Sequence, residues 1–474
     1  MSKKSDIDDA GSMGSSSGSL YDQDRIILER LGYKQSLDRS LSAFSNFGVT
    51  FSCCSILAGL TPLYGEALQS GGPMTVIWGW LLVSFFTLMV GLSLAEICSA
   101  FPTSGGLYVW TTRLCSAAWA PIASWTVGYT NWLGLVRSIA IASTDLAMAQ
   151  FLASLVSMTS SYNPNTYVIF AIYVCILLLH GVVNSMAVRL NGLFNNMSVW
   201  WHIIGTATIV IVVLVMTPQR QSAEFVFTTW VNNTGWSSSF YVFMLGLLQS
   251  QYTLSGYDSA AHMAEETQNA STGGPMGIIM AIVTASVVGW IFLVGMTFSI
   301  GNFETQIVHP AVGVALSQIF YDSCGQGVAI FLILIILGAQ FFCGSALTLA
   351  SSRMVYAFAR DGALPWSKRL HKLNKEKSPV AAVWFNIAFC FVLGLPYIWS
   401  ETAYSAIVSV NTIAPVFDSC RDHFEWMDYC DERVVLVSDR VSGDADEHEL
   451  CVGPIRGGDW AVCELLCDLG KALV

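Results

Sequence analysis

The chain carries nine apolar stretches, and a helix needs about 20 such residues to cross the hydrocarbon of a bilayer. They lie near residues 42–69, 74–98, 117–154, 166–187, 196–216, 239–265, 276–300, 327–358 and 380–399, and a tenth begins at about 403–415. Only 12% of the residues are charged, whereas soluble domains carry about 25%. The sequence therefore predicts an all-α polytopic membrane protein.

The sixth stretch is interrupted at residues 255–258, which place a glycine and an acidic residue at hydrocarbon depth. Gly256 lies roughly 24 Å along the helix from Phe240, at ~1.5 Å of rise per residue. A helix breaks inside a membrane where it is buried in protein or lines a water-filled cavity. Asp258 costs about 3 kcal/mol there and marks a functional site by default. The alternative, a structural Asp258 with Gly256 as a helix-packing contact, stays open.

The first stretch contains a second interruption. Ala58 and Gly59 lie inside it, Pro62 follows directly, and Gly65 lies beyond. Because proline removes a backbone donor and clashes with the preceding turn, we expect this helix to divide near residues 55–61. Broken first and sixth spans are expected when two inverted halves of a secondary transporter each supply a discontinuous helix to a site in mid-membrane.

The loops predict the orientation of the chain. Residues 1–41 begin with a Ser, Gly and Asp-rich segment that is too polar to fold alone, followed by a short helix candidate at 24–32, and we expect a disordered N-terminus without a signal peptide. Arg113, Arg189 and the basic cluster at 360–377 all follow even-numbered spans, with Arg220 as the exception. The positive-inside rule then puts the N-terminus in the cytosol. Asn232 opens a glycosylation sequon, which falls on the outer side.

Ionisable residues also occur inside the apolar spans. Arg137 and Asp145 in the third span are ~12 Å of rise apart, too far for a direct salt bridge, so each needs another partner and neither is given a substrate role. His202 in the fifth span is a candidate for relaying a proton. The alternative is a hydrogen-bonded packing histidine.

Enzyme and metal chemistry lack a sequence signal. The eight cysteines before residue 416 have no metal-ligand spacing and are typical of small buried apolar residues. No nucleophile–base pair, metal cluster, phosphate loop or basic nucleic-acid patch is present. We therefore expect no enzyme activity, no metal, no cofactor and no nucleic-acid partner.

Three motifs, in the runs 91–110, 250–270 and 351–365, together closely resemble the amino acid/choline transporter branch of the amino acid-polyamine-organocation permeases. This branch includes GABA and choline permeases of fungi and the bidirectional amino acid transporters of plants. The resemblance covers roughly residues 31–415. It implies two inverted five-helix repeats, with the first and sixth spans unwound around a midplane site and alternating access by rocking.

The resemblance also implies a substrate site. The carboxylate of the substrate is held by backbone N–H groups where the first span restarts, at Ser55, Leu57, Ala58 and Gly59. The amino group is held by carbonyls of the unwound sixth span, at Ser255, Gly256, Tyr257 and Asp258. The physical chemistry agrees, because a half-helix N-terminus carries roughly half a positive charge and unpaired donors. Asp258 suits an ammonium, and Tyr257 either walls the pocket or packs over a ligand cation.

Further implied roles concern gating, coupling and location. Glu96, Arg360 and Asp361 are expected to gate the cytoplasmic side or anchor its loops, and His202 is placed at the proton-coupling position. The expected partners are an amino acid or a small amine such as GABA or choline, a coupling proton or an exchange substrate, and the lipid bilayer. The plasma membrane is the expected location.

The chain departs from the family after residue 415. The acidic tail at 416–474 contains five cysteines and no apolar span, so the second repeat of the permease domain at 42–415 is incomplete. The composition of the tail fits translation out of frame or through an intron at least as well as a real domain. The alternative function is therefore a truncated, non-transporting membrane protein that acts as a receptor or a partner-binding subunit.

Overall fold

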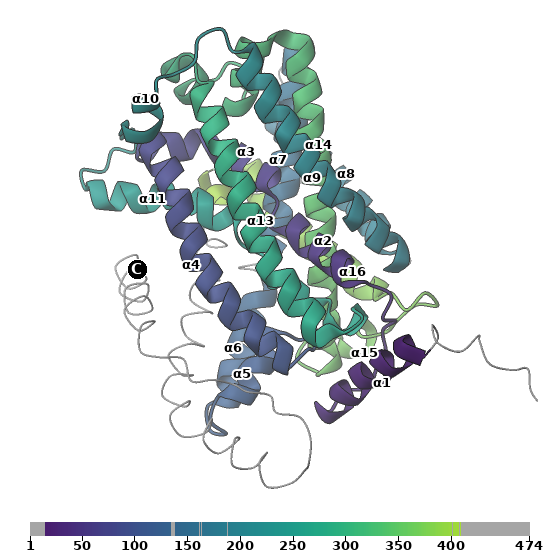
Figure 1. The fold of residues 1–474 in the computed structure, drawn as a ribbon. Helices are drawn as coiled ribbons and strands as arrows, with labels where there is room; N and C mark the ends of the chain where they lie inside the picture. Colours follow the sequence, from purple (N-terminus) through teal and green to yellow (C-terminus); the bar gives the residue numbers. More distant parts are fainter. Residues whose placement is uncertain are drawn as a thin grey trace, which may run out of the picture.

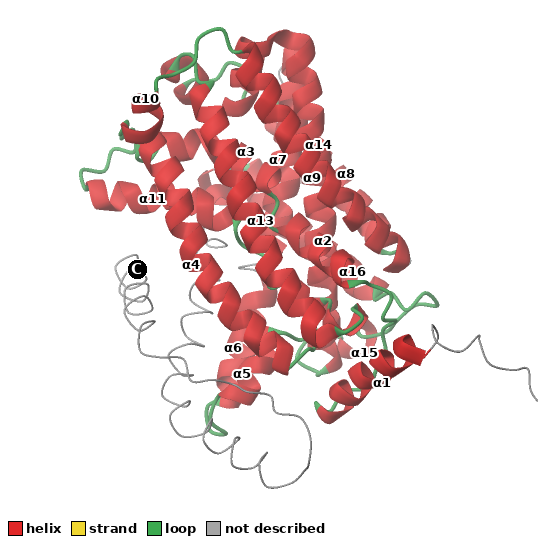
Figure 2. Cartoon of the chain, viewed as in Figure 1, coloured by secondary structure: helices red, strands yellow, loops and turns green. Residues whose placement is uncertain are grey.

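Long helices lying side by side make up the body of the molecule (Figure 1). The structure is a computed structural model that describes residues 15–133, 138–160, 162, 164–186, 188–400, 402–406 and 408. Within these residues there are helices and loops but no strand (Figure 2). The predicted all-α polytopic fold is therefore confirmed. The tail at 416–474 and most of the predicted start of a tenth span lie outside the described residues.

Eight helical segments of the described chain are long and apolar enough to cross a membrane. They confirm eight of the nine predicted spans. The sixth span is too short by this measure because its break leaves α11 (Ser239–Thr253) only 15 residues long, followed by α12 (Ser259–His262). The eight segments are α2 with α3 (Ala43–Gln69), α4 (Gly72–Ala100), α7 (Ser138–Thr159), α8 (Thr166–Asn184), most of α9 (Val188–Met216), α13 (Ala270–Phe298), α14 (Ala315–Arg360) and α16 with η3 (Val380–Ile398).

The boundaries of two spans differ from the prediction. The third span is described in two segments, α6 (Ala120–Leu133) and α7, with residues 134–137 outside the described part, and it ends at Thr159 rather than at 154. The eighth span starts twelve residues earlier than predicted, at Ala315, and bends at Gly325, whose φ is 75°. A search for apolar stretches does not find the first turns of this helix, because they contain polar residues. Among these, Gln318 Nε2 donates a hydrogen bond to Asp322 at 2.8 Å. A hydrogen bond between side chains one turn apart thus accompanies the polar start of this helix.

Glycines allow α4 and α13 to approach closely along their length. A Cβ on Gly91 of α4 would lie 2.3 Å from Ile282 Cδ1, and one on Gly289 of α13 would lie 2.2 Å from Trp80 Cζ2. The indole of Trp80 also donates to Ser286 O at 2.8 Å. Close backbone approach through small residues is the usual way in which helices associate within membranes.

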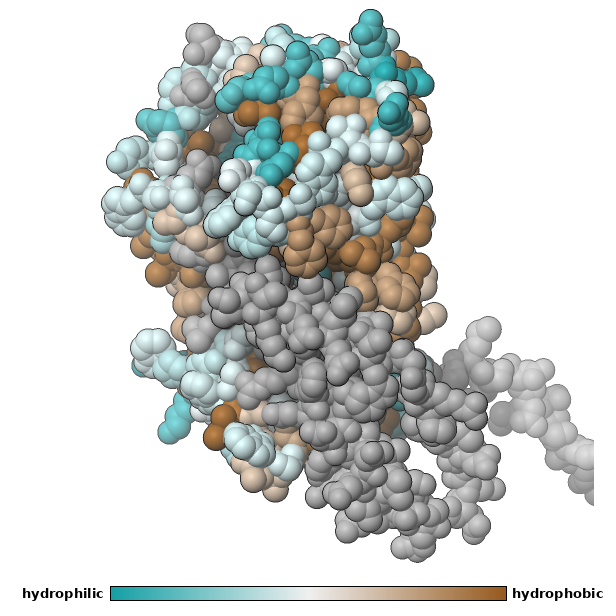
Figure 3. All heavy atoms as spheres, turned by 90° about the vertical axis from the view of Figure 1, so that its left-hand side faces the viewer, coloured by the Kyte–Doolittle hydropathy of each residue, from teal (hydrophilic) through white to brown (hydrophobic). Residues whose placement is uncertain are grey.

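The outside of the bundle exposes large apolar side chains, which in a soluble protein would form an unusually extended patch. Trp200, Val215 and Phe240 are exposed by 60%, 72% and 60%. On the face drawn in Figure 3, brown apolar side chains gather around the middle of the molecule and teal polar ones toward its upper end. This arrangement is typical of a bundle whose sides contact lipid.

One end of the bundle, which we call the α1 end, is covered by α1 (Ser15–Arg30), α5 (Leu107–Leu114) and α15 (Ser367–Leu370), whereas α10 (Ala223–Thr228) marks the opposite, α10 end (Figure 1). Residues 15–41 fall in the stretch for which the sequence predicts disorder, yet they form α1 and a segment that packs on the bundle. Asp24 explains the difference, because its carboxylate accepts hydrogen bonds from the N–H groups of Asn269 (2.8 Å) and Ala270 (3.1 Å). It thereby satisfies donors that the first turn of α13 leaves unpaired.

Candidate functional site

The first span breaks between α2 (Ala43–Cys53) and α3 (Ile56–Gln69). Ser55 caps α3, and its Oγ accepts a hydrogen bond from the N–H of Ala58 at 3.1 Å. The N–H of Gly59 donates to Ser55 O at 2.9 Å. The N–H groups of Ile56 and Leu57 belong to the first turn and have no partner inside the helix. Of the predicted carboxylate ligands, Leu57 therefore offers the least occupied donor.

Gly59 has a packing role as well. A Cβ at this position would lie 2.6 Å from the hydroxyl and 2.8 Å from the Cα of Thr253 on α11. Gln249, one turn earlier on α11, donates to Leu60 O at 2.9 Å. Glycine at position 59 thus lets α3 and α11 lie against each other directly above the two breaks.

The sixth span breaks between α11 and α12, where Gly256 adopts a φ of 88° that L-residues with a side chain rarely adopt. Its carbonyl accepts from the N–H (3.1 Å) and the hydroxyl (2.6 Å) of Ser259. The carbonyl of Asp258 accepts from the N–H of Ala261 at 3.0 Å. These two of the four predicted amine-binding carbonyls already accept hydrogen bonds from N–H or O–H groups in this conformation, and a third, that of Ser255, accepts from the thiol of Cys54.

The two breaks face each other. The Sγ atom of Cys54 donates to Ser255 O at 3.2 Å, and a Cβ on Gly256 would lie 3.3 Å from that of Cys53. Tyr257 is buried beside this contact. The sequence prediction that the first and sixth spans divide at these positions is borne out by the helix ends, and the structure brings the predicted residues together from stretches about two hundred positions apart.

The carboxylate of Asp258 points along its own helix turn, because Oδ2 lies 3.5 Å from Nε2 of His262. The other ring nitrogen of His262, Nδ1, lies 2.8 Å from Ser104 O. Sequence reasoning missed His262, although its position four residues after Asp258 puts both side chains on one helix face. The pair joins the sixth span to the loop before α5.

His202 lies at the restart of the first span. Its Nε2 is 2.6 Å from Ser55 Oγ, and its Nδ1 is 2.8 Å from the carbonyl of Ser198. A carbonyl only accepts, so Nδ1 carries hydrogen and the neutral ring receives the hydroxyl hydrogen of Ser55 on Nε2. Ser198 in turn lies 2.6 Å from Ser52. A buried hydrogen-bonded chain therefore runs from α9 to the cap of α3.

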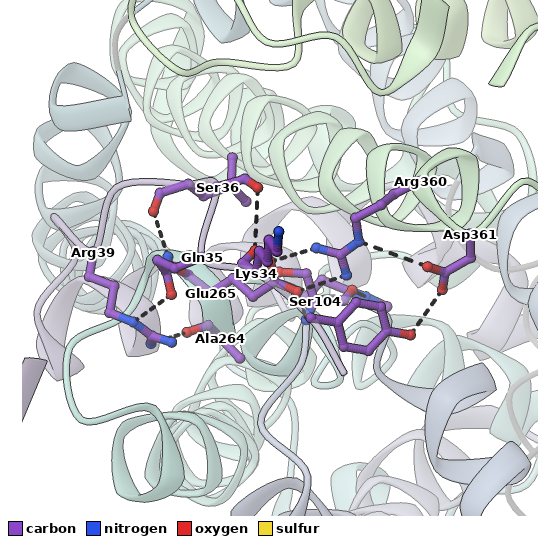
Figure 4. Close-up of polar contacts among 12 residues, drawn as sticks. Lys34, Gln35, Ser36, Arg39, Ser104, Ala264, Glu265, Arg360 and Asp361 are labelled. Carbon is purple, nitrogen blue, oxygen red and sulfur yellow. Dashed lines mark hydrogen bonds and ion pairs between the residues drawn. The ribbon is translucent and has the colours of Figure 1, made fainter. Parts of the chain in front are cut away.

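At the α1 end, polar side chains from four segments meet at Glu265 (Figure 4). The guanidinium of Arg360 donates to this carboxylate at 2.8 and 3.0 Å, and Ser104 N donates to it at 3.1 Å. Gln35 donates to the carbonyl of Glu265 at 2.9 Å. We call this arrangement, with the residues that contact Arg360 and Asp361, the gate cluster.

Aromatic residues complete the gate cluster. The guanidinium carbon of Arg360 lies 4.3 Å from the ring centroid of Tyr33, and the hydroxyls of Tyr33 and Tyr108 donate to Asp361 at 3.1 and 2.8 Å. Burial, with the Asp361 carboxylate beside it, raises the pKa of Tyr33 to about 12, so this hydroxyl remains a donor at neutral pH. The predicted gate residues Arg360 and Asp361 are thus brought together. Glu96 is exposed on α4, and no described contact joins its carboxylate to the cluster.

A second ion pair lies deeper in the bundle. Arg353 Nε donates to Glu266 Oε1 at 3.0 Å, and both side chains are fully buried. Arg39, also buried, donates to Ala264 O at 3.0 Å and Thr267 O at 2.8 Å. Sequence reasoning missed these pairings. The sequence did contain a signal for them. Arg353 and Arg360 are seven residues apart and therefore share one face of α14, and their partners are the adjacent glutamates 265 and 266.

Asn232 and Asp145, two other predicted positions, do not belong to the residues at the two breaks. Asn232 is exposed near the α10 end, and its side chain hydrogen-bonds within the loop to Thr234 and Trp236. Arg137 lies outside the described residues, and so do the cysteines of the tail. The partner that Asp145 requires is His180, a residue that sequence reasoning did not single out.

Comparison with known proteins agrees with this geometry. The sequence model described as "Amino acid permease" matches residues 41–417. The chain belongs to the amino acid permease family, and it is a multi-pass integral membrane protein.

Its relatives include plant and fungal permeases. The amino-acid permease BAT1 homolog of Oryza sativa subsp. japonica is 42% identical over 81% of this chain and 77% of its own length. The amino-acid permease BAT1 of Arabidopsis thaliana is 38% identical, over 83% of this chain and 79% of its own length. The GABA-specific permease of Saccharomyces cerevisiae is 30% identical over 82% of this chain and 68% of its own length.

Proposed function

We propose that this chain is a secondary-active transporter of amino acids or related small amines, such as GABA or choline, that works by alternating access. The observation that carries the proposal is the pair of facing helix breaks, with Cys54 Sγ 3.2 Å from Ser255 O. Broken helices at membrane depth offer backbone donors and acceptors to a ligand. The family and the relatives named for amino acids and GABA support the substrate class.

The substrate carboxylate binds the first turn of α3, at the backbone N–H groups of Ser55, Leu57, Ala58 and Gly59. Within this set the N–H group of Leu57 is the most available donor, because the N–H groups of Ala58 and Gly59 already donate hydrogen bonds to Ser55. The partial positive charge of the helix N-terminus adds to the attraction for an anion. The capping hydroxyl of Ser55 sets the position of this turn.

The substrate ammonium binds the break of the sixth span, at Ser255, Gly256, Tyr257 and Asp258. The carbonyl of Ser255 accepts a hydrogen bond from the thiol of Cys54, which is a weak donor. An ammonium is a stronger donor and displaces it. Asp258 contributes negative charge near this point, and Tyr257 walls the pocket.

His202 couples transport to a proton. Protonation turns Nε2 from an acceptor into a donor, so the Ser55 hydroxyl has to release its own hydrogen bond and accept instead. Since Ser55 caps the turn that receives the carboxylate, the proton and the substrate act on one residue. Exchange of one substrate for another, without a net proton, is the alternative coupling mode.

The α1 end faces the cytosol, because Lys368, Arg369 and Lys372 gather there and positive residues remain on that side. The gate cluster is then the cytoplasmic gate, and this conformation is closed toward the cytosol. The N-terminus is cytosolic, Asn232 lies outside, and the plasma membrane is the proposed location. The proposed permease domain comprises residues 42–415.

The proposal is tested by reconstituting the full chain into liposomes and measuring exchange of radiolabelled amino acids, GABA and choline. We expect exchange of at least one amino acid, and loss of it when Gly256 is replaced by valine. A correctly inserted protein that shows neither uptake driven by a proton gradient nor exchange of any compound in the panel overturns the transport proposal. Binding of an amino acid without movement across the membrane favours the receptor alternative.

A further inference from the structure

A second buried pair of ionisable side chains lies between α7 and α8, apart from the proposed substrate contacts. Asp145 and His180 are both fully buried, and His180 Nδ1 is 3.1 Å from Asp145 Oδ2. The other ring nitrogen, Nε2, lies 3.1 Å from the backbone carbonyl of Phe341 on α14. Both nitrogens of this histidine therefore face an oxygen.

The hydrogen bonds fix how many protons the pair holds. The Phe341 carbonyl can only accept, so Nε2 carries a hydrogen. An ionised Asp145 also only accepts, so the contact at Nδ1 needs a second hydrogen, either on the ring or on the carboxyl group. Without it, two lone pairs would face each other at 3.1 Å and the pair would carry a buried negative charge. The observed geometry therefore requires one proton more than a neutral histidine and a carboxylate supply.

The surroundings of Asp145 make this proton important. Its second oxygen, Oδ1, is buried and has no hydrogen-bond partner among the described residues. Among the described residues, the titratable groups that interact with it, His180 apart, are the hydroxyls of Tyr173, Tyr252 and Tyr404 and the thiols of Cys343 and Cys390, and none of these side chains can carry a positive charge. A buried carboxylate with so few donors requires a compensating positive charge or its own proton.

The pair lies directly behind the proposed substrate site. A Cβ on Gly344 of α14 would lie 2.4 Å from Asp145 Oδ1 and 2.6 Å from His180 Cε1, so the helix backbone presses on both side chains. Cys343, the preceding residue, donates to Cys53 O at the break of the first span, at 3.8 Å. Ser143, two residues before Asp145, lies 2.6 Å from the Tyr252 hydroxyl on α11. Each break is therefore connected to the Asp145–His180 pair by a short path of contacts, through Cys343 from the first span and through Ser143 from the sixth.

We propose that Asp145 and His180 form a proton-binding site, which holds one exchangeable proton in this conformation and contributes to the pH dependence of transport. The ligand is the proton itself, shared between Nδ1 and Oδ2. When this proton is lost, the Asp145 carboxylate and the Nδ1 lone pair of His180 repel each other. This repulsion pushes α7 and α8 apart where they pack on α14. The second part of the proposal rests on the proposed transport function, whereas proton binding does not.

Proton binding is tested by spectroscopy on the full chain at neutral pH, without any substrate. Solid-state NMR of protein with ¹⁵N-labelled histidine reports the protonation of His180, whose signal is assigned by its absence in His180→Gln. Infrared difference spectra of wild type and Asp145→Asn report whether Asp145 is a protonated carboxyl. Either an imidazolium signal from His180 or a carboxyl band from Asp145 supports the proposal. A neutral His180 together with an ionised Asp145 overturns it.

The chain offers a matched control. Glu304 and His309 form an exposed carboxylate–histidine pair, 3.6 Å apart, outside the membrane spans. Glu304→Gln should leave the His180 signal unchanged, whereas Asp145→Asn should remove any imidazolium signal, because an amide cannot compensate the ring charge. Monodisperse protein on size exclusion establishes that each variant is folded.

The contribution to transport is tested by the rate of GABA or alanine exchange in proteoliposomes over a range of pH. Asp145→Asn should lose one step of the wild-type pH profile, and Glu304→Gln should retain the whole profile. An unchanged profile, or loss of all exchange in a monodisperse Asp145→Asn protein, overturns this part. If wild type itself shows neither proton-driven uptake nor exchange, the transport proposal fails, and the spectroscopy still decides whether the pair binds a proton.

Discussion

The hydroxyl of Ser55 lies 2.6 Å from Nε2 of His202, so one side chain both caps the restarted first span and contacts the buried histidine of the fifth. Ser55→Ala removes the cap and the contact together. We expect about 1 kcal/mol of lost stability and a marked fall in GABA or alanine exchange, measured in proteoliposomes and by thermal unfolding.

The matched control for this variant is Ser42→Ala. Ser42 caps α2 by accepting from Ser45 N at 3.1 Å, in the same way as Ser55 caps α3, but it is remote from His202. This variant should lose similar stability and retain exchange. Equal exchange in the two variants would show that Ser55 matters only as a cap.

Gly256→Val should abolish exchange while leaving membrane insertion intact. The left-handed backbone at φ 88° disfavours a side chain by roughly 1–2 kcal/mol, and the new Cβ would lie 3.3 Å from Cys53. Gly235 has nearly the same backbone, with a φ of 80°, but nothing lies within 4 Å of its Cβ position. Gly235→Val therefore isolates the backbone strain, and its exchange should equal that of wild type. Normal exchange by Gly256→Val would refute the placement of the substrate there.

Arg360→Ala should open the gate cluster toward the α1 end. Removing one member of a largely buried pair costs up to about 3 kcal/mol, and each ~1.4 kcal/mol corresponds to a tenfold shift in population. The buried thiol of Cys54 should then be alkylated at least about tenfold faster, as followed by peptide mass spectrometry. Lys377→Ala breaks an exposed pair with Asp38 and should leave the rate unchanged. Unchanged labelling in Arg360→Ala would exclude a gating role.

Glu266 and Arg353 should behave as a coupled pair. Both are fully buried, so Glu266→Gln or Arg353→Met alone should destabilise the protein by about 3–5 kcal/mol, since each leaves an uncompensated charge. The double variant should lose less than the sum of the two. Thermal unfolding of the four proteins gives the coupling energy, and additive losses would show that the ion pair contributes nothing.

Tyr33→Phe removes one of the two hydroxyls that donate to Asp361. Because the pKa of Tyr33 is raised from 10.0 to about 12, the native state binds this proton more tightly than the unfolded chain does. The stabilisation is therefore fully present below pH 10 and is lost as the pH rises through about 12. The difference in stability between wild type and Tyr33→Phe should therefore be constant from neutral pH to about pH 9, which is below the ordinary tyrosine pKa of 10.0. A difference that varied between neutral pH and pH 9 would contradict the assignment.

Hydrophobicity predicted the spans, because each helix must present an apolar surface to lipid, and the polar and small residues inside two of these surfaces predicted the breaks. The polar start of α14 was not predicted for the same reason. Gln318 and Asp322 form a hydrogen bond with each other and present no apolar surface to lipid. Pro62, which entered the prediction for the first span, lies inside α3, and the span divides earlier, at Ser55. The division into two inverted repeats stays a prediction.

The polar contacts depend on residues distant in the chain, which no local pattern reveals. Sequence reasoning named Asp145 without its partner, since nothing in an apolar run marks His180 as a neighbour 35 positions away. It named Arg360 and Asp361 as gate residues, but not Tyr33, which comes from a segment expected to be disordered. Apolar surface is visible one helix at a time, whereas a hydrogen bond between helices exists only once they pack.

The backbone of Gly344 leaves no room for a methyl group against Asp145 and His180. This fit sets a rule for how the three positions can change over evolution. A relative with alanine at the position of Gly344 cannot also keep both ionisable side chains in place, so we expect the three residues to be inherited, or lost, together. An alignment of many permeases would then show them as one covarying group that is separate from the residues of the two helix breaks.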